Sequence, residues 1–182
     1  MVEADGFVSG ARLIPSPNFD DRPDGAGIDL LVIHNISLPP GAFGGPGVVA
    51  LFSNNLNPTD HPYYQTIQDL KVSSHFFIRR DGELIQFVSC LKRAWHAGLS
   101  NWRGRERCND FSIGVELEGT DEEPFTDPQY QTLGKLKLAL KAAYPIQEVV
   151  GHSDISPGRK TDPGPHFDWA RYRSIYSNNS DS

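Results

Sequence analysis

Residues 28–34 form a short apolar run that ends in His34. A run with aliphatic residues on both of its faces is typical of a strand that is covered on both sides. We therefore expect a fully buried central strand here, in a sheet with other elements packed on both faces. A second apolar pair, Val149-Val150, lies shortly before His152 and predicts another strand. Each of these two predicted strands thus ends near a histidine.

Two further regions predict strands. Residues 72–79 and 83–88 flank Arg80-Asp81-Gly82, and an Asp-Gly pair supplies the positive φ angles that a tight hairpin needs. Residues 111–118 alternate strictly, with apolar side chains on one face and both Glu116 and Glu118 on the other. A buried strand that presents two glutamates is unusual unless that face lines a site.

The strongest helix signal begins at Asp127-Pro128, because aspartate is a preferred N-cap and proline a preferred first helical residue. The apolar residues that follow fall near one stripe, namely Tyr130, Leu133, Leu136, Leu140 and Tyr144. A shorter helix is expected over 48–56, whereas 15–29, 37–46 and 61–64 predict irregular structure. Strands and helices intermixed in this way predict an α/β fold with a central mixed β-sheet flanked by α-helices.

A length of 182 residues suits a single domain. We expect that domain over residues 1–176, followed by a frayed tail over 177–182. Residues 37–62 are rich in proline and glycine and are a candidate for a mobile lid near His34.

The composition narrows the class of protein. No apolar stretch approaches the roughly 20 residues of a membrane-spanning helix, and a net charge of −6 gives no basic footprint for nucleic acid. We therefore expect neither a membrane nor a nucleic acid as partner, and nothing indicates an obligate protein partner. Cys90 and Cys108 are too few for a disulfide framework. Together with an N-terminus unlike a secretory signal, they favour free thiols in a cytoplasmic protein.

Three residues predict a metal site. His34 and His152 each follow an apolar strand, and Asp162 lies in a polar loop before Pro163. Two imidazoles and one carboxylate are the ligand set of a catalytic zinc ion with an open fourth position. The alternative is two unrelated hydrogen-bonded histidines, with Asp162 capping a helix near residues 167–170. We favour Zn²⁺ because the three residue types occur together.

Two further residues carry chemistry in this hypothesis. Glu116 is the candidate general base for a metal-activated water, and Glu118, on the same strand face, competes for that role. Lys160 is positioned to stabilise the oxyanion that forms when water adds to a carbonyl. The alternatives are a glutamate on a solvated sheet edge and an ordinary surface lysine. The residues alone thus predict a zinc hydrolase.

The chain also resembles the zinc-dependent N-acetylmuramoyl-L-alanine amidases, whose fold is shared with the animal peptidoglycan recognition proteins. The stretches that carry the resemblance are residues 15–19, 34–41, 94–98, 104–114 and 160–165. The resemblance spans nearly the whole chain and is strongest to the cytosolic enzymes of cell-wall recycling. It implies a mixed sheet with flanking helices, zinc held by His34, His152 and Asp162, and Glu116 and Lys160 as catalytic groups. In the animal proteins the third ligand is typically cysteine, so Asp162 places this chain with the bacterial enzymes.

The resemblance also implies a substrate, a soluble anhydro-muropeptide. The reaction would cleave the amide between the lactyl group of 1,6-anhydro-N-acetylmuramic acid and L-alanine of the stem peptide. Since that peptide carries several carboxylates, Arg107 is a candidate contact, as is Lys71, where relatives have arginine. Trp95 is a candidate for packing against the sugar, and Asn35 is a candidate for binding the amide. Because this substrate is a signal precursor, the enzyme would influence β-lactamase induction.

Two other functions remain open at the level of sequence. One is an amidase that acts on intact murein, and the other is a non-catalytic peptidoglycan-binding module. His75 and His96 are expected to be structural or to support the ligands, because three protein ligands already suffice. His61 and His166 receive no role.

Overall fold

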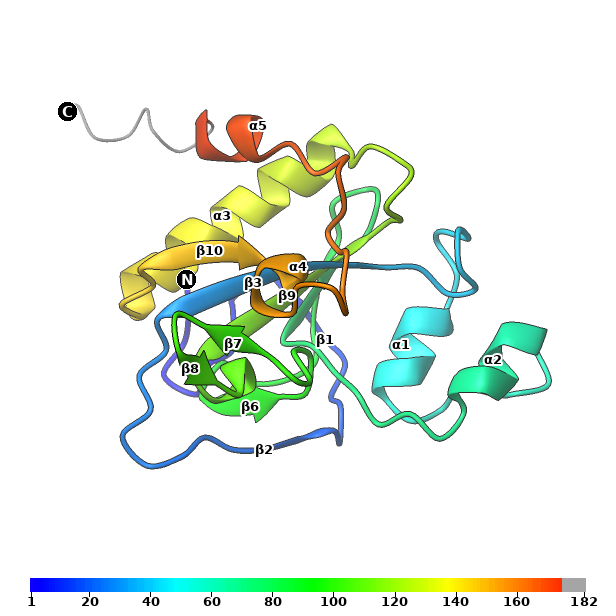
Figure 1. Cartoon of the computed structure of the whole chain (residues 1–182), viewed down its shortest axis with the longest axis horizontal. Helices are drawn as coiled ribbons and strands as arrows, with labels where there is room; N and C mark the ends of the chain where they lie inside the picture. Colours follow the sequence, from blue (N-terminus) through cyan, green and yellow to red (C-terminus); the bar gives the residue numbers. More distant parts are fainter. Residues whose placement is uncertain (175–182) are drawn as a thin grey trace.

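The apolar run that ends in His34 lies inside a six-stranded sheet of the computed structural model, which describes residues 1–174 (Figure 1). The strands, in order across the sheet, are β1 (Arg12–Leu13), β5 (Leu84–Gln86), β4 (Phe76–Ile78), β9 (Ser112–Glu118), β3 (Leu30–Ile36) and β10 (Glu148–Gly151). The last four are mutually parallel, whereas β5 runs antiparallel to β4. The sheet is therefore mixed, as the sequence predicts.

Four short strands form two small antiparallel pairs outside this sheet. They are β2 (Phe19–Asp21) with β6 (Lys92–Ala94), and β7 (Asn101–Trp102) with β8 (Arg105–Glu106). The helices are α1 (Gly47–Phe52), α2 (Pro62–Ile67), α3 (Asp127–Ala143), α4 (His152–Ile155), α5 (Trp169–Ser174) and the 3-10 helix η1 (Cys108–Asp110).

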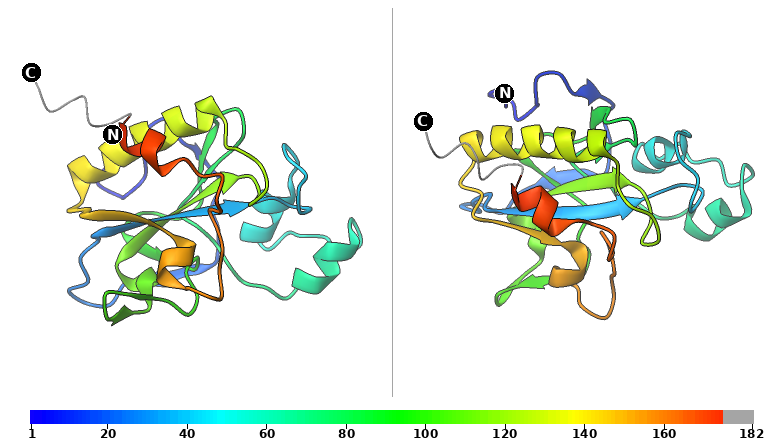
Figure 2. Two further views of the ribbon diagram at one scale, coloured as in Figure 1. Left: turned by 45° about the horizontal axis from the view of Figure 1, so that its top comes forward. Right: turned by 90° about the horizontal axis from the view of Figure 1, so that it is seen from above.

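Helices cover the sheet as expected for an α/β domain (Figure 2). The long helix α3 runs along one face, where its leucines pack on Leu31 and Ile33 of β3 and on Ile113 of β9. The small strands β6, β7 and β8 lie on the opposite side, whereas α1 and α2 stand beyond the end toward which β3 points. Alternation along the strands turns the other side chains of β3 and β9 away from α3. That second face carries the functional residues described below.

The structure corrects several boundaries. Thr126, not Asp127, is the N-cap of α3, because its hydroxyl accepts from the backbone N–H of Gln129 and the Gln129 side chain reaches back to the Thr126 N–H. The segment 61–64, expected to be a loop, instead begins α2, with the His61 ring as cap and Pro62 at the first position.

Other predictions hold with shorter or shifted limits. The hairpin is confirmed, but its paired strands contain three residues each, and only Gly82 of the Asp-Gly pair has a positive φ. The strand predicted over 28–34 extends to Ile36, so His34 lies within β3, not at its end. The arm over 15–29 contains β2, and the helix predicted over 48–56 ends at Phe52. The tail predicted over 177–182 lies outside the described residues.

Cys90 and Cys108 are both buried free thiols, as predicted. Among residues 1–174, no helix has the length and apolar character needed to cross a membrane.

A half-buried arginine in the arm, Arg22, ties that arm to the sheet. Its guanidinium donates to four backbone carbonyls, those of Cys90, Asn109, Asp110 and Ser112. Burial lowers the pKa of Arg22 to about 10, so the side chain remains charged at neutral pH. A charged donor shared among several buried acceptors stabilises a fold because each acceptor would otherwise lose its partner.

Replacing Arg22 with methionine is therefore expected to lower the free energy of unfolding by about 2–4 kcal/mol, since it leaves several carbonyls unpaired. Urea denaturation measures the change. The matched control is Arg12→Met, which removes an exposed ion pair to Glu83 and should cost less than about 0.5 kcal/mol. Equal losses in the two variants would contradict this account of the arm.

Candidate metal centre

The centre lies on the face of the sheet that is turned away from α3, where side chains on or just after the neighbouring parallel strands β9, β3 and β10 come together. The β3–β9 register sets His34 directly opposite Glu116. On the other side of β3, Gly151 at the end of β10 lies opposite Ile33, so the next residue, His152, reaches the same region. In parallel sheets, functional side chains commonly gather at the carboxyl ends of the strands.

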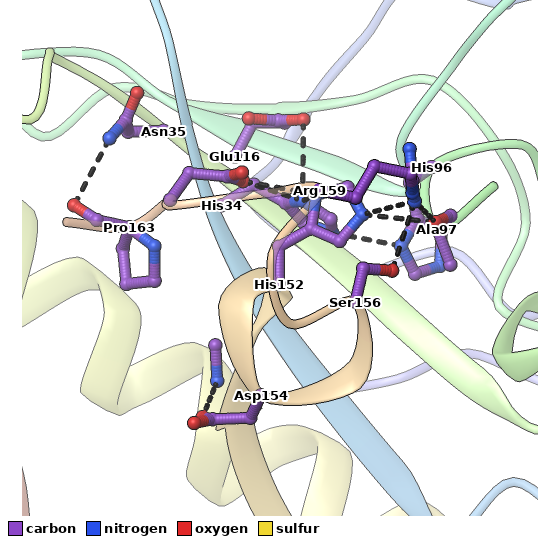
Figure 3. Close-up of polar contacts among 12 residues, drawn as sticks. His34, Asn35, His96, Ala97, Glu116, His152, Asp154, Ser156, Arg159 and Pro163 are labelled. Carbon is purple, nitrogen blue, oxygen red and sulfur yellow. Dashed lines mark hydrogen bonds and ion pairs between the residues drawn. The ribbon is translucent and has the colours of Figure 1, made fainter. Parts of the chain in front are cut away.

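The third predicted ligand, Asp162, comes from the loop that follows α4. Its backbone carbonyl accepts a hydrogen bond from the N–H of Ser153 at 3.0 Å. The loop packs closely on β10, since a Cβ added to Gly151 would lie 2.8 Å from Pro163. The amide of Asn35 donates to the Pro163 carbonyl at 3.0 Å and so ties the loop to β3 as well (Figure 3).

These contacts bring three ligand atoms together. The Nδ1 atom of His34 lies 3.0 Å from Nδ1 of His152 and 3.0 Å from Oδ2 of Asp162. The His152 Nδ1 atom lies 3.2 Å from the same carboxylate oxygen. His34, His152 and Asp162 therefore form a group that could hold a metal ion.

The protonation states of this group suit a metal ion. Burial lowers the pKa of His34 to about 4, so its imidazole is neutral at pH 7. Burial alone would raise the pKa of Asp162, but its close contacts with the His152 and His34 rings outweigh burial and hold that pKa below its usual range. Neutral imidazoles and an ionised carboxylate are the forms that bind metals.

Glu116 stands beside the group without a partner of its own. Its Oε1 atom lies 3.9 Å from Nδ1 of His34, and its buried Oε2 atom has no hydrogen-bond partner within residues 1–174. Burial, followed by the charge of Asp162, raises the pKa of Glu116 well above its ordinary value. An unpaired buried carboxyl is costly to a fold, which is why such groups are frequent at active sites.

Glu118, the competing candidate, has structural partners instead. Its carboxylate accepts from the backbone N–H groups of Gly44 at 2.6 Å and Arg80 at 3.1 Å, and it pairs with the Arg79 guanidinium. Its side chain is 3% exposed and does not line the cavity at the centre. These contacts favour Glu116 over Glu118 as the base.

A cavity of about 600 Å³ opens onto the centre, a size typical of small-molecule sites. Besides the ligands and Glu116, it is lined by three predicted residues: Asn35, Trp95 and Lys160. Both N–H groups of the Asn35 amide already bond, to Asp121 and to the Pro163 carbonyl. Only the oxygen of this amide is therefore left to contact a substrate, as an acceptor.

Two predicted substrate contacts lie apart from this cavity. Lys71 is exposed and does not line it, although its neighbours Leu70 and Val72 do. Arg107 is 78% exposed, lies 3.4 Å from the Asp110 carboxylate and lines a smaller cavity. Both contacts stay predictions, without support from the geometry.

The remaining histidines fall into two groups. His75 and His96 are buried, whereas His61 caps α2 and His166 is exposed. The alternative capping role of Asp162 is filled by Asp168, whose carboxylate accepts from the backbone N–H of Arg171 in α5. Arg159, beside Lys160, is a charged lining residue that the sequence analysis missed; it contacts carbonyls that only the folded chain brings near.

Known proteins resemble this chain over most of its length. The family model described as N-acetylmuramoyl-L-alanine amidase matches residues 24–165. The 1,6-anhydro-N-acetylmuramyl-L-alanine amidase AmpD of Escherichia coli is 56% identical over 179 residues, which cover 97% of this chain and 98% of that protein.

Solved structures agree with this match. A crystal structure of selenomethionine AmpD superposes with a TM-score of 0.94 at 56% identity and covers 96% of this chain and 99% of that one. The amidase AmiD of E. coli, solved with the substrate anhydro-N-acetylmuramic acid-L-Ala-D-γ-Glu-L-Lys, gives a TM-score of 0.61 at 30% identity, covering 86% of this chain and 65% of that one. A family model that spans most of the chain and a full-length relative at this identity leave one conclusion: the chain belongs to the N-acetylmuramoyl-L-alanine amidase family and is an amide hydrolase.

Proposed function

We propose that this amidase uses one Zn²⁺ ion to hydrolyse the amide between the lactyl group of 1,6-anhydro-N-acetylmuramic acid and L-alanine of the stem peptide. The observation that carries the proposal is the cluster of His34, His152 and Asp162, which lines a cavity beside Glu116, whose buried Oε2 atom has no hydrogen-bond partner among residues 1–174. The full-length similarity to AmpD supports the choice of substrate.

Zinc fits the donor set, because two imidazole nitrogens and one carboxylate oxygen leave a fourth position open. When bound, zinc supplies a Lewis acid that polarises the carbonyl and acidifies a water molecule. The roles of the chain's own residues follow from their positions. His34, His152 and Asp162 would hold the ion, and the cavity wall formed by Asn35 and Trp95 would orient the substrate.

Glu116 would take the proton of the attacking water and return it to the leaving amine. Its carboxyl lies 3.9 Å from a proposed ligand atom, where it could act first as base and then as acid. Lys160, at the cavity wall, is exposed and has the positive charge needed to stabilise the oxyanion.

Lys160→Ala is expected to lower kcat by about 10²–10³-fold, the usual effect of removing one oxyanion-stabilising group. Zinc content should stay near that of the wild-type protein, because Lys160 is not a ligand. Turnover assays together with metal analysis test both statements. Lys141, an exposed lysine on α3 that does not line the cavity, gives the control variant Lys141→Ala. Loss of zinc from Lys160→Ala would instead assign this residue a structural role.

The proposal places the enzyme in cell-wall recycling in the cytoplasm, where buried free thiols are stable. Its soluble substrate would connect the enzyme's activity to β-lactamase induction. The two alternatives are an amidase for intact murein and a non-catalytic binding module, and the unpartnered Glu116 beside the ligands favours a catalyst over the latter.

A substrate comparison separates the three functions. Zinc-loaded protein is incubated with anhydro-muropeptides and, separately, with whole sacculi, and released peptide is measured. We expect rapid release from anhydro-muropeptides and much slower release from sacculi. Faster release from sacculi would overturn the recycling assignment, and binding without release from either would make the protein a binding module.

A further inference from the structure

The Nε2 atoms of His34 and His152, which face away from the centre, both contact one dipeptide, His96-Ala97. The Nε2 atom of His34 lies 2.9 Å from Nδ1 of His96. The Nε2 atom of His152 lies 2.9 Å from the backbone carbonyl of Ala97, the next residue (Figure 3). A single short segment thus contacts both imidazoles from behind.

The Ala97 carbonyl favours one tautomer of the His152 ring. A carbonyl oxygen only accepts, so its contact at 2.9 Å places the hydrogen on Nε2 and leaves the Nδ1 lone pair for the centre; the Arg159 guanidinium lies farther from Nε2, at 3.4 Å. His34 needs the same arrangement to bind a metal. If the His34 Nε2 atom carries the hydrogen, the Nδ1 atom of His96 must accept it. The hydrogen of the neutral His96 ring is then on its Nε2 atom, which lies 3.2 Å from the Ser112 hydroxyl. That hydroxyl can accept it.

The dipeptide is itself held in place on every side. The backbone N–H groups of His96 and Ala97 both donate to the Asn109 side-chain oxygen, at 3.2 and 2.9 Å. Arg159 donates to the Ala97 carbonyl at 2.7 Å. The His96 ring lies against bare backbone of β9, because a Cβ added to Gly114 would lie 2.5 Å from its Cγ atom. A ring so enclosed has little freedom to turn away from His34.

We propose that His96 is a positioning residue that sets the tautomer of His34, while the adjoining Ala97 carbonyl does the same for His152. This inference rests on the proposed metal site and adds to it the reason why both Nδ1 atoms face the ion. Ligand histidines usually donate their outer N–H to a carboxylate, a carbonyl or water. Here an imidazole that contacts Ser112 on its other side takes that place for one of the two ligands.

The test compares two buried histidines of equal size. His96→Phe replaces the imidazole with a somewhat larger aromatic ring that has no acceptor, and is expected to weaken zinc binding about 10- to 100-fold, as measured by competition with a chelator. The control is His75→Phe, because His75 is fully buried and 5.8 Å from the His96 ring, but bonds to Gly114 and Lys92 and not to a ligand. It should lose fold stability while its folded fraction binds zinc as tightly as the wild type.

Two milder variants keep the test decisive if His96→Phe folds poorly. His96→Gln restores an acceptor oxygen and should recover part of the zinc affinity. Ser112→Ala removes the partner of His96 Nε2 and should weaken zinc binding less than His96→Phe does.

Wild-type zinc affinity in both His96 variants would overturn the inference. A wild-type protein that binds no zinc would instead overturn the proposed metal site. The two failures are therefore distinguishable.

Discussion

Asp162→Ala is expected to abolish hydrolysis, with kcat/KM lowered by about 10³-fold or more, because the Lewis acid that it would help to hold contributes several kcal/mol to catalysis. Asp162 supplies the only negative charge among the three proposed ligands, and its Oδ2 atom lies within 3.2 Å of both imidazoles. Its loss leaves two neutral nitrogens to hold the ion. The zinc content of the purified variant, measured by elemental analysis, should fall with the activity.

Asp168→Ala is the matched control for this variant. Asp168 is exposed, comes from the same C-terminal region and contacts α5, not the centre. Its loss should cost about 1 kcal/mol of stability at most and leave zinc content unchanged. If Asp162→Ala kept both its zinc and half of its turnover, the ligand assignment would be wrong.

Glu116→Gln is the second variant with a large expected effect. It preserves shape and removes the base, so kcat should fall by about 10²–10⁴-fold, the range for general acid–base catalysis. Zinc content should remain near one ion per chain, because Glu116 is not a proposed ligand. Glu118→Gln serves as comparison, since its single amide oxygen can accept from only one of the Gly44 and Arg80 N–H groups, and it should lower stability more than turnover. Normal turnover in Glu116→Gln would remove Glu116 from the mechanism.

The same variant has a stability signature in metal-free protein. Burial raises the pKa of Glu116, so the folded state binds its proton more tightly than the unfolded chain does. Its contribution to stability is thus fully present below the ordinary pKa of 4.5 and is lost as the pH rises through the raised, folded-state pKa. Glu116→Gln removes this loss, so in urea titrations the free energy of unfolding of the variant should rise relative to that of the wild type as the pH increases across that range. An unchanged profile would contradict the buried, unpartnered carboxyl.

Local patterns were sufficient for five of the six strands of the main sheet and missed only the two-residue edge strand β1. The alternation over residues 111–118 predicts β9 and places Glu116 on the face opposite α3, because strand geometry has a fixed period of two. The apolar run before His34 predicts a central strand for the same kind of reason. The first residue of α3 was harder to predict from the sequence. Thr126 and Asp127 are both good N-caps, and only the reciprocal hydrogen bonds with Gln129 decide between them.

Contacts between loops could not be predicted in this way. Arg159 and Asn109 bond to the backbone of residues 96–99, and no spacing in the sequence signals that these segments meet. Arg107 and Lys71 show a different limit of the sequence. Their charge suits the substrate, but charge alone does not say where a side chain lies, and neither residue lines the cavity at the centre, so both contacts stay predictions.

The pairing of β3 with β9 has an evolutionary consequence. His34 and Glu116 face each other only in one alignment of these strands, and a slip by a single residue would send one of them to the side of α3. Selection for a stable interior and selection for turnover therefore act on the same backbone, and neither can drift alone.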